Sequence, residues 1–133
     1  MQVFFYGLFM DESILRKNGL QPSDPRIGYL DHYVLKIGNR ASLLPKENER
    51  SWGVVMDVDQ KAIQELYAEP SVADYVPEEV SITLNNGEVV PASCYNLPLE
   101  LMTGKPNREY ATALYELGKK LGLPDDYLEK IMV

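Results

Sequence analysis

Trp52-Gly53-Val54-Val55-Met56-Asp57-Val58 opens the stretch that decides the fold, and this stretch continues to Tyr75. The opening run is mostly apolar and rich in valine, a composition that predicts a buried strand. Asp59 follows as a good N-cap for a short helix, because its side chain can accept from the first free amides. Three residues then fall on one apolar face of that helix: Ile63, Leu66 and Tyr67. The stretch therefore predicts a strand and a helix that share one core.

Glu69 comes directly after this apolar helix face, between Ala68 and the helix-stopping Pro70. Surface turns more often carry Asp, Asn or Gly at such a position. A single carboxylate presented at the end of a core-packed helix is a candidate acid/base group. The alternative is that Glu69 is one of the many glutamates near helix ends that water solvates.

The composition describes one globular domain over residues 1–133, with 45% hydrophobic and 25% charged residues. Its net charge of −7 argues against nucleic-acid or anionic-membrane partners, since both need a basic face. One Cys and one His allow neither an internal disulfide nor a multi-histidine metal site. No apolar run approaches the roughly 20 residues of a membrane span, and the N-terminus lacks a basic signal-peptide region. We therefore expect a cytoplasmic protein.

A second feature is the junction that follows the first predicted strand, Gln2 to Tyr6. Gly7 breaks this strand, and Leu8-Phe9-Met10 connects it to a helix capped by Asp11. Backbone N–H groups at a strand–turn–helix junction lack partners, so the junction is a candidate anion or oxyanion site. An ordinary tight connection is the alternative. The Walker spacing and its lysine are missing, so the junction is not a phosphate loop.

The remaining elements complete an α+β pattern. We expect a strand over 26–37, a charged surface excursion over 46–50, a hairpin turning at Asn86-Gly87, a helix from 107 to 121 and a last helix from 125. Pro77 and Pro91 lie in the two arms of the hairpin, which predicts a bent pair of strands, as in a small barrel. The long helix carries one packing stripe: Tyr110, Leu114, Leu117 and Leu121.

Several pieces recur in the order and spacing of a known family. They are Phe5-Tyr6-Gly7 before a helix, Gly38-Asn39, Trp52-Gly53-Val54-Val55, Glu69, Tyr75, Cys94-Tyr95 and Gly122-Leu123-Pro124. Over nearly its whole length the chain resembles the γ-glutamyl cyclotransferase-like proteins, which include the AIG2-like proteins and the γ-glutamylamine cyclotransferases. The resemblance implies an α+β fold in which a small mixed β-barrel-like sheet is flanked by helices.

The resemblance also implies a reaction and a site. Members of the family cyclise a small γ-glutamyl compound to 5-oxoproline and release an amino acid or amine, a transferase or lyase activity that needs no metal or cofactor. By resemblance, Glu69 matches the catalytic glutamate. The implied substrate-binding residues are the end of the first strand with its loop (Tyr6, Gly7, Leu8, Phe9 and Met10) and two aromatic positions (Tyr75 and Tyr95).

Leu8 and Phe9 depart from the family pattern, which has Ser or Thr and often Asn after Tyr-Gly. The side-chain groups that would contact a substrate are therefore replaced, although the backbone amides remain. Two hypotheses follow: a γ-glutamyl cyclotransferase-like enzyme with Glu69 as general acid/base, or a non-catalytic small-molecule-binding or interaction protein on the same fold. The enzyme hypothesis predicts that Glu69 faces a cavity that the loop after Gly7 also lines.

Overall fold

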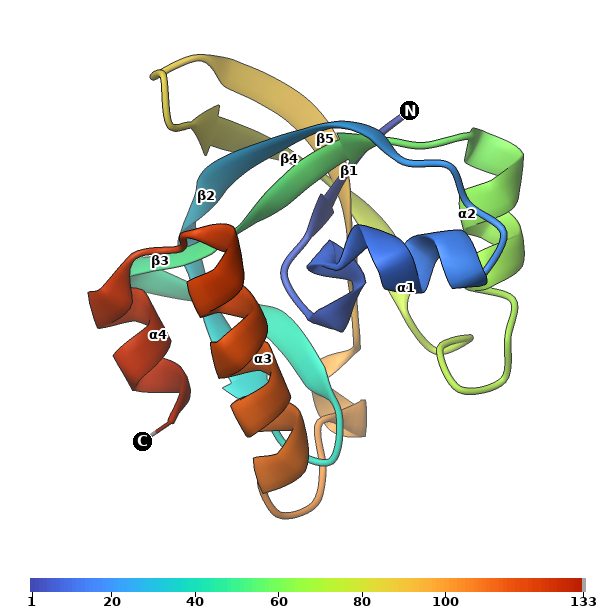
Figure 1. The fold of residues 1–133 in the computed structure, drawn as a ribbon. Helices are drawn as coiled ribbons and strands as arrows, with labels where there is room; N and C mark the ends of the chain where they lie inside the picture. Colours follow the sequence, from blue (N-terminus) through green and yellow to red (C-terminus); the bar gives the residue numbers. More distant parts are fainter. Residues whose placement is uncertain (133) are drawn as a thin grey trace.

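Five strands close a barrel in the order β1–β3–β2–β4–β5 (Figure 1). The structure is a computed structural model that describes residues 1–132. The strands are β1 (Gln2–Phe5), β2 (Ser23–Ile37), β3 (Ala41–Asp57), β4 (Val76–Leu84) and β5 (Val89–Asn96). Neighbouring strands pair antiparallel, except that β1 and β5 pair in parallel and so close the barrel. The predicted α+β fold with a barrel-like sheet is confirmed.

Four α-helices and two short 3-10 helices surround the barrel. They are η1 (Leu8–Met10), α1 (Glu12–Lys17), α2 (Gln60–Leu66), η2 (Leu99–Leu101), α3 (Arg108–Leu121) and α4 (Asp125–Ile131). α3 and α4 lie together at one end of the molecule, and α1 and α2 lie at the other (Figure 1). Within residues 1–132, no helix combines the length and the apolar character needed to cross a membrane.

Local side-chain caps begin three of these helices where the sequence predicts them. The Asp11 carboxylate accepts from the Ser13 amide at 2.9 Å, and the Asp59 carboxylate accepts from the Ala62 amide at 3.0 Å. Asn107 caps α3 in the same way, through the Tyr110 amide. Each cap satisfies an amide that has no partner inside its helix, which explains why the helices begin there.

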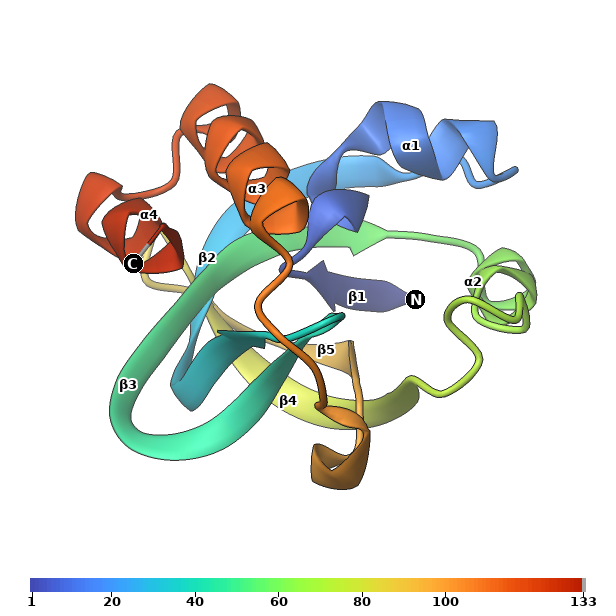
Figure 2. The ribbon, with the colours of Figure 1, turned by 90° about the horizontal axis from the view of Figure 1, so that it is seen from below.

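The core is divided between the inside of the barrel and the space beneath the helices. Along β1, Phe4 and Tyr6 join an inner cluster built from all five strands, whereas Val3 and Phe5 join an outer cluster with residues of all four α-helices. This alternation follows from the two-residue period of a strand. Figure 2 shows the strands curving around the barrel interior, with helices along its outside.

The predicted charged surface excursion over 46–50 lies within strand β3, as a wide bulge with mostly exposed residues. Tyr33 pairs with Pro45 and Asp31 with Arg50, so residues 46–49 have no partner in β2 and the hairpin continues on both sides of them. His32, with a φ of 68°, lies at the register shift between those two pairs. The charged side chains of the bulge stay in water, and the pairing resumes at Arg50, so the sequence indicated the excursion but not the strand that flanks it on both sides.

Asn96 is a buried polar residue that joins three strands at one end of the barrel. Its Oδ1 accepts from the Leu43 amide at 3.2 Å, and its Nδ2 donates to Glu78 at 2.6 Å. We expect Asn96→Ala to lower the free energy of unfolding by about 2 kcal/mol, because it leaves the buried Leu43 amide without a partner. Urea unfolding measures this change. Gln64→Ala, on the exposed face of α2, is the control, and an equal loss in both variants would contradict the assignment.

Candidate functional site

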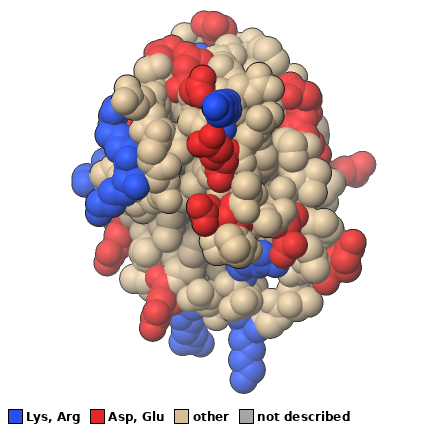
Figure 3. Space-filling view, turned by 90° about the vertical axis from the view of Figure 1, so that its right-hand side faces the viewer, with Lys and Arg blue, Asp and Glu red and all other residues tan. Residues whose placement is uncertain are grey.

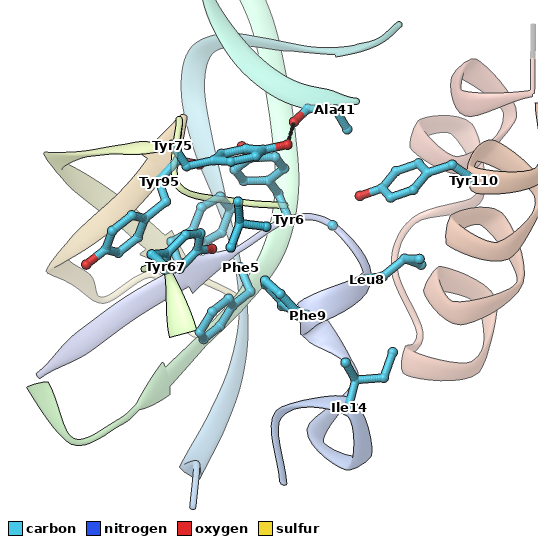
Figure 4. A pocket seen from close by; sticks show the side chains of 13 residues that line it. Phe5, Tyr6, Leu8, Phe9, Ile14, Ala41, Tyr67, Tyr75, Tyr95 and Tyr110 are labelled. Carbon is cyan, nitrogen blue, oxygen red and sulfur yellow. Dashed lines mark hydrogen bonds between the residues drawn. The ribbon is translucent and has the colours of Figure 1, made fainter. Parts of the chain in front are cut away.

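A cavity of about 300 Å³ lies between the β1–η1 junction, the segment that follows α2, and α3 (Figure 4). All its lining residues are uncharged, and most are aromatic or aliphatic. Its tyrosines come from distant parts of the chain: Tyr6, Tyr67, Tyr75, Tyr95 and Tyr110. A concave, mostly apolar space with a few polar groups is the usual form of a small-molecule site.

The structure brings six of the seven predicted substrate-binding residues to this cavity. They are Tyr6, Gly7, Leu8, Phe9, Tyr75 and Tyr95. Met10 is the exception, because its side chain is only 1% exposed and packs in the outer core cluster. A 3-10 helix has three residues per turn, so while Leu8 and Phe9 face the cavity, Met10 turns away from it. The Met10 amide, which the resemblance assigns to substrate binding, donates to the Gly7 carbonyl at 3.0 Å in this structure, so a binding role for Met10 stays a prediction.

Glu69 lies in the turn between α2 and β4, and its side chain is exposed. Tyr67 and Val72, on either side of it in sequence, line the cavity, but Glu69 does not. The turn is tightened by two backbone hydrogen bonds, from the Glu69 amide to Leu66 and from the Val72 amide to Glu69. With Tyr67 and Val72 turned inward, the residue midway along the turn faces water. The expectation that Glu69 faces the cavity is therefore wrong, and its catalytic role stays a prediction.

Stacked aromatic rings form one wall of the cavity. The rings of Tyr67 and Tyr95 are parallel, with centroids 3.9 Å apart. Phe9 meets Tyr67 edge to face at 6.0 Å, and Tyr75 lies 6.1 Å from Tyr67 on another side. Burial raises the pKa of Tyr67, and burial raises the pKa of Tyr75 to about 12. The tyrosine hydroxyls therefore stay protonated near neutral pH and can donate hydrogen bonds.

Of the five tyrosine hydroxyls of the cavity residues, two are hydrogen-bonded within the part of the chain that the structure describes and three are not. The Tyr6 hydroxyl donates to the Tyr95 carbonyl at 2.7 Å, and the Tyr75 hydroxyl donates to the Ala41 carbonyl at 2.6 Å. Among residues 1–132, the hydroxyls of Tyr67, Tyr95 and Tyr110 make no side-chain hydrogen bond to the protein, and none of them is fully enclosed by it. These three hydroxyls are the free side-chain donors of the residues that line the cavity.

Tyr110 brings its hydroxyl from α3 to the β1–η1 junction (Figure 4). A Cβ atom on Gly7 would overlap the hydroxyl oxygen, so this close approach requires glycine at position 7. Burial raises the pKa of Tyr110, while the nearby Leu8 amide lowers it. Within residues 1–132, no backbone carbonyl accepts from the amides of Leu8 and Phe9. The Tyr110 hydroxyl therefore lies beside the Leu8 amide at this end of the cavity, and the Phe9 amide follows in the same turn.

From the sequence, Tyr110 is predicted only as part of the packing stripe of the long helix. The available signal was a tyrosine at the N-terminal end of a stripe that otherwise consists of leucines. A hydroxyl at a core-facing helix position needs a polar neighbour, so a tyrosine in such a stripe indicates a polar site next to the helix.

Arg40, in the turn between β2 and β3, forms an ion pair with Asp74, in the segment between α2 and β4 that also carries Glu69. Its Nη2 lies 3.2 Å from the Asp74 carboxylate, and its guanidinium lies 5.9 Å from the centre of the Tyr75 ring. Arg40 does not line the cavity, although its neighbour Ala41 does. Because the ion pair is partly exposed, it contributes little to the free energy of folding. Its main effect is to hold the segment between α2 and β4 near the β2–β3 turn.

Charged side chains are distributed over the surface in separate groups. Figure 3 shows acidic side chains spread over the face turned toward the viewer and basic side chains in small groups. This face offers no continuous basic surface for nucleic acid. Among residues 1–132, no three His, Cys, Asp or Glu side chains gather as metal ligands would.

Comparison with known proteins now places the chain in a family. A family model described as the AIG2-like family matches residues 50–131. The chain belongs to the AIG2-like family. The match begins at Arg50 and includes the last part of β3, the turn that carries Glu69 and the helix that carries Tyr110. No curated protein sequence matches the chain.

Solved structures show the same fold at low sequence identity. A γ-glutamyl cyclotransferase superposes with a TM-score of 0.80 at 20% identity, covering 98% of this chain and 85% of its own. An uncharacterized protein from Homo sapiens gives a TM-score of 0.79 at 22% identity, with coverages of 98% and 85%. A glutathione-specific γ-glutamyl cyclotransferase from yeast gives a TM-score of 0.69 at 13% identity, with coverages of 99% and 93%. This AIG2-like protein therefore has the γ-glutamyl cyclotransferase fold.

Proposed function

We propose that this AIG2-like protein is a γ-glutamyl cyclotransferase-like enzyme that converts a small γ-glutamyl compound to 5-oxoproline and a free amine. The supporting observation is the convergence of the Leu8 and Phe9 amides with the Tyr110 hydroxyl in one cavity. The segment that carries Glu69 forms part of the wall of the same cavity. The similarity in fold to γ-glutamyl cyclotransferases adds support.

The proposed reaction is an intramolecular aminolysis. The α-nitrogen of the γ-glutamyl group attacks the γ-carbonyl carbon, a new C–N bond closes a five-membered lactam, and the original amide C–N bond breaks. Two protons leave the attacking ammonium, and the departing nitrogen receives two, so charge and atoms balance without water. Because the nucleophile belongs to the substrate, the protein has to fix its conformation, move protons and stabilise the oxyanion.

The residues of the cavity fit two of these tasks. We assign the Leu8 and Phe9 amides and the Tyr110 hydroxyl as the donors to the oxyanion that forms on the γ-carbonyl, since all three residues line the cavity. Glu69 is the proposed proton carrier from the attacking nitrogen to the departing one. In the free protein it is exposed, so it acts after the turn between Tyr67 and Val72 brings its carboxylate inward over a bound substrate.

Release of 5-oxoproline is the direct test. Wild-type protein is incubated with a panel of γ-glutamyl amino acids and γ-glutamyl amines, and the lactam and the free amine are quantified by mass spectrometry. We expect both products in equal amounts from at least one member of the panel. No lactam from any member would overturn the proposal.

A non-catalytic small-molecule-binding protein is the second candidate. Two observations favour it: no Asp, Glu, Lys, Arg or His lines the cavity, and the Glu69 side chain is exposed. This candidate predicts saturable binding of a γ-glutamyl compound, measured by calorimetry, with no lactam formed. The product assay and the binding assay together separate the two functions.

Tyr110→Phe tests the proposed oxyanion donor. We expect this variant to lower kcat by about tenfold with KM within about twofold, because a donor aimed at the oxyanion acts mainly in the transition state. Tyr115→Phe is the matched control, since Tyr115 is on the same helix and outside the cavity lining. Equal kcat in both variants would remove Tyr110 from the mechanism.

A further inference from the structure

We infer that the cavity selects γ-glutamyl compounds whose departing amine carries an aromatic or large apolar group, and that Phe9 is a specificity-determining residue for this group. The inference rests on the proposed function, because it assigns the two halves of the substrate to two parts of the same cavity. It names a substrate class that is narrower than γ-glutamyl compounds in general.

The polar groups of the cavity lie on one side, which assigns the γ-glutamyl half of the substrate. The amides of Leu8 and Phe9 and the hydroxyl of Tyr110 gather at the β1–η1 junction. A γ-glutamyl group carries a carboxylate and an amide carbonyl, and both need donors such as these. The amine half must then extend along the remainder of the wall.

That remaining wall is mostly apolar. It is formed by Phe5, Phe9, Ile14, Tyr67 and Val72, among which the Tyr67 hydroxyl is the one polar side-chain group and no side chain is charged. An ammonium group placed here would lose water without gaining an ionic partner, whereas a ring would gain contact area. The wall therefore favours an uncharged, apolar amine over one with a second charge.

Phe9 has the central place in this wall. Its ring lies 6.5 Å from Phe5 and 6.0 Å from Tyr67, edge to face with each. In Figure 4 the Phe9 side chain lies on the side of Phe5 and Tyr67, whereas the Leu8 side chain extends toward α3. Phe9 thus shapes the amine half of the cavity.

The rings are not arranged as an open cage for a cation. Cation binding requires free ring faces directed at a common centre. One face of Tyr67 is covered by Tyr95 at a centroid distance of 3.9 Å, and Phe9 takes part in edge-to-face contacts with its neighbours. These contacts use ring surface that a cation would need, so an apolar group fits better.

Three substrates distinguish the effect of a charge on the departing amine from the effect of its size. γ-Glutamyl-pentylamide and γ-glutamyl-5-aminopentylamide have chains of the same length and differ in one terminal ammonium, and γ-glutamyl-phenethylamide adds a ring. We expect kcat/KM to be at least about tenfold higher for the pentylamide and the phenethylamide than for the aminopentylamide. A ratio near one in the wild type would overturn the inference, and this comparison needs no variant.

Phe9→Ala tests the residue. We expect it to lower the preference for the phenethylamide over the aminopentylamide by about tenfold, because part of the apolar wall is removed. Leu117→Ala is the matched control, since Leu117 packs on the core but does not line the cavity. In this variant the ratio of kcat/KM for the phenethylamide to kcat/KM for the aminopentylamide should stay as in the wild type. If Phe9→Ala leaves this ratio of kcat/KM values unchanged, Phe9 does not determine the specificity.

Calorimetric binding of the same three compounds separates this inference from the proposed function. If no lactam forms but the phenethylamide binds about tenfold more tightly than the aminopentylamide, the enzyme proposal fails and the selectivity stands. If lactam forms at equal kcat/KM from all three compounds, the selectivity fails and the enzyme proposal stands. If neither lactam nor a difference in binding is found, both fail.

Discussion

Glu69→Gln is expected to lower kcat for 5-oxoproline release by about a hundredfold, with KM changed by no more than about twofold. Glutamine keeps the size of the side chain and its hydrogen bonding but cannot accept a proton. Because Glu69 is exposed and lies outside both core clusters, the substitution leaves the fold intact. A large loss of kcat would therefore report on chemistry and not on stability.

Glu65→Gln is the matched control for this experiment. Glu65 is also exposed, lies one helical turn earlier on α2 and does not line the cavity. Its replacement should leave kcat as in the wild type. If both variants turn over equally and as fast as the wild type, the proton carrier is another residue. A loss confined to Glu69→Gln would also show that the exposed turn moves inward during turnover, because the carboxylate must reach the reacting nitrogen.

Gly53→Ala is expected to lower the free energy of unfolding by about 3 kcal/mol or more. Gly53 is in β3, where a Cβ atom would overlap the Phe5 carbonyl oxygen and lie 2.8 Å from the Phe4 ring. The first of these neighbours is backbone in the paired strand β1, so relief of the overlap would separate two strands of the closed barrel. Urea unfolding followed by circular dichroism measures the loss.

Gly118→Ala is the matched comparison, because Gly118 is equally buried but its added Cβ would overlap a Leu128 methyl group. A flexible side chain can move aside, and alanine favours the helix over glycine by up to about 1 kcal/mol. We expect a net change within about 1 kcal/mol for this variant. Equal losses in both variants would mean that β1 and β3 shift more freely than the barrel geometry implies.

Features that depend on nearest neighbours could be predicted from the sequence. Asp11, Asp59 and Asn107 cap their helices, and Gly122, with a φ of 88°, ends α3 as expected. The Asn86-Gly87 turn joins β4 to β5. Each of these choices depends on a hydrogen bond or a backbone angle that lies within a few residues, so the local sequence contains all the necessary information.

The candidate site could be predicted only in part. Six residues proposed from resemblance do line one cavity, because strand β1 and its turn are positioned by the same barrel that other proteins of this fold share. The orientation of Glu69 could not be predicted. Whether a turn residue faces a cavity or water depends on how its neighbours, here Tyr67 and Val72, pack against distant strands.

By itself, the sequence determined the strands, most helix ends, the α+β class and the family resemblance, since hydrophobic period and capping are local properties. The tertiary structure alone decided that the charged run before Trp52 forms a bulge within strand β3, that the Met10 side chain turns into the core and that Tyr110 reaches Gly7. Tyr110 and Gly7 are separated by about a hundred residues, and only closure of the barrel with α3 against it brings them together. Contacts at that separation depend on the packing of whole elements, which no local pattern specifies.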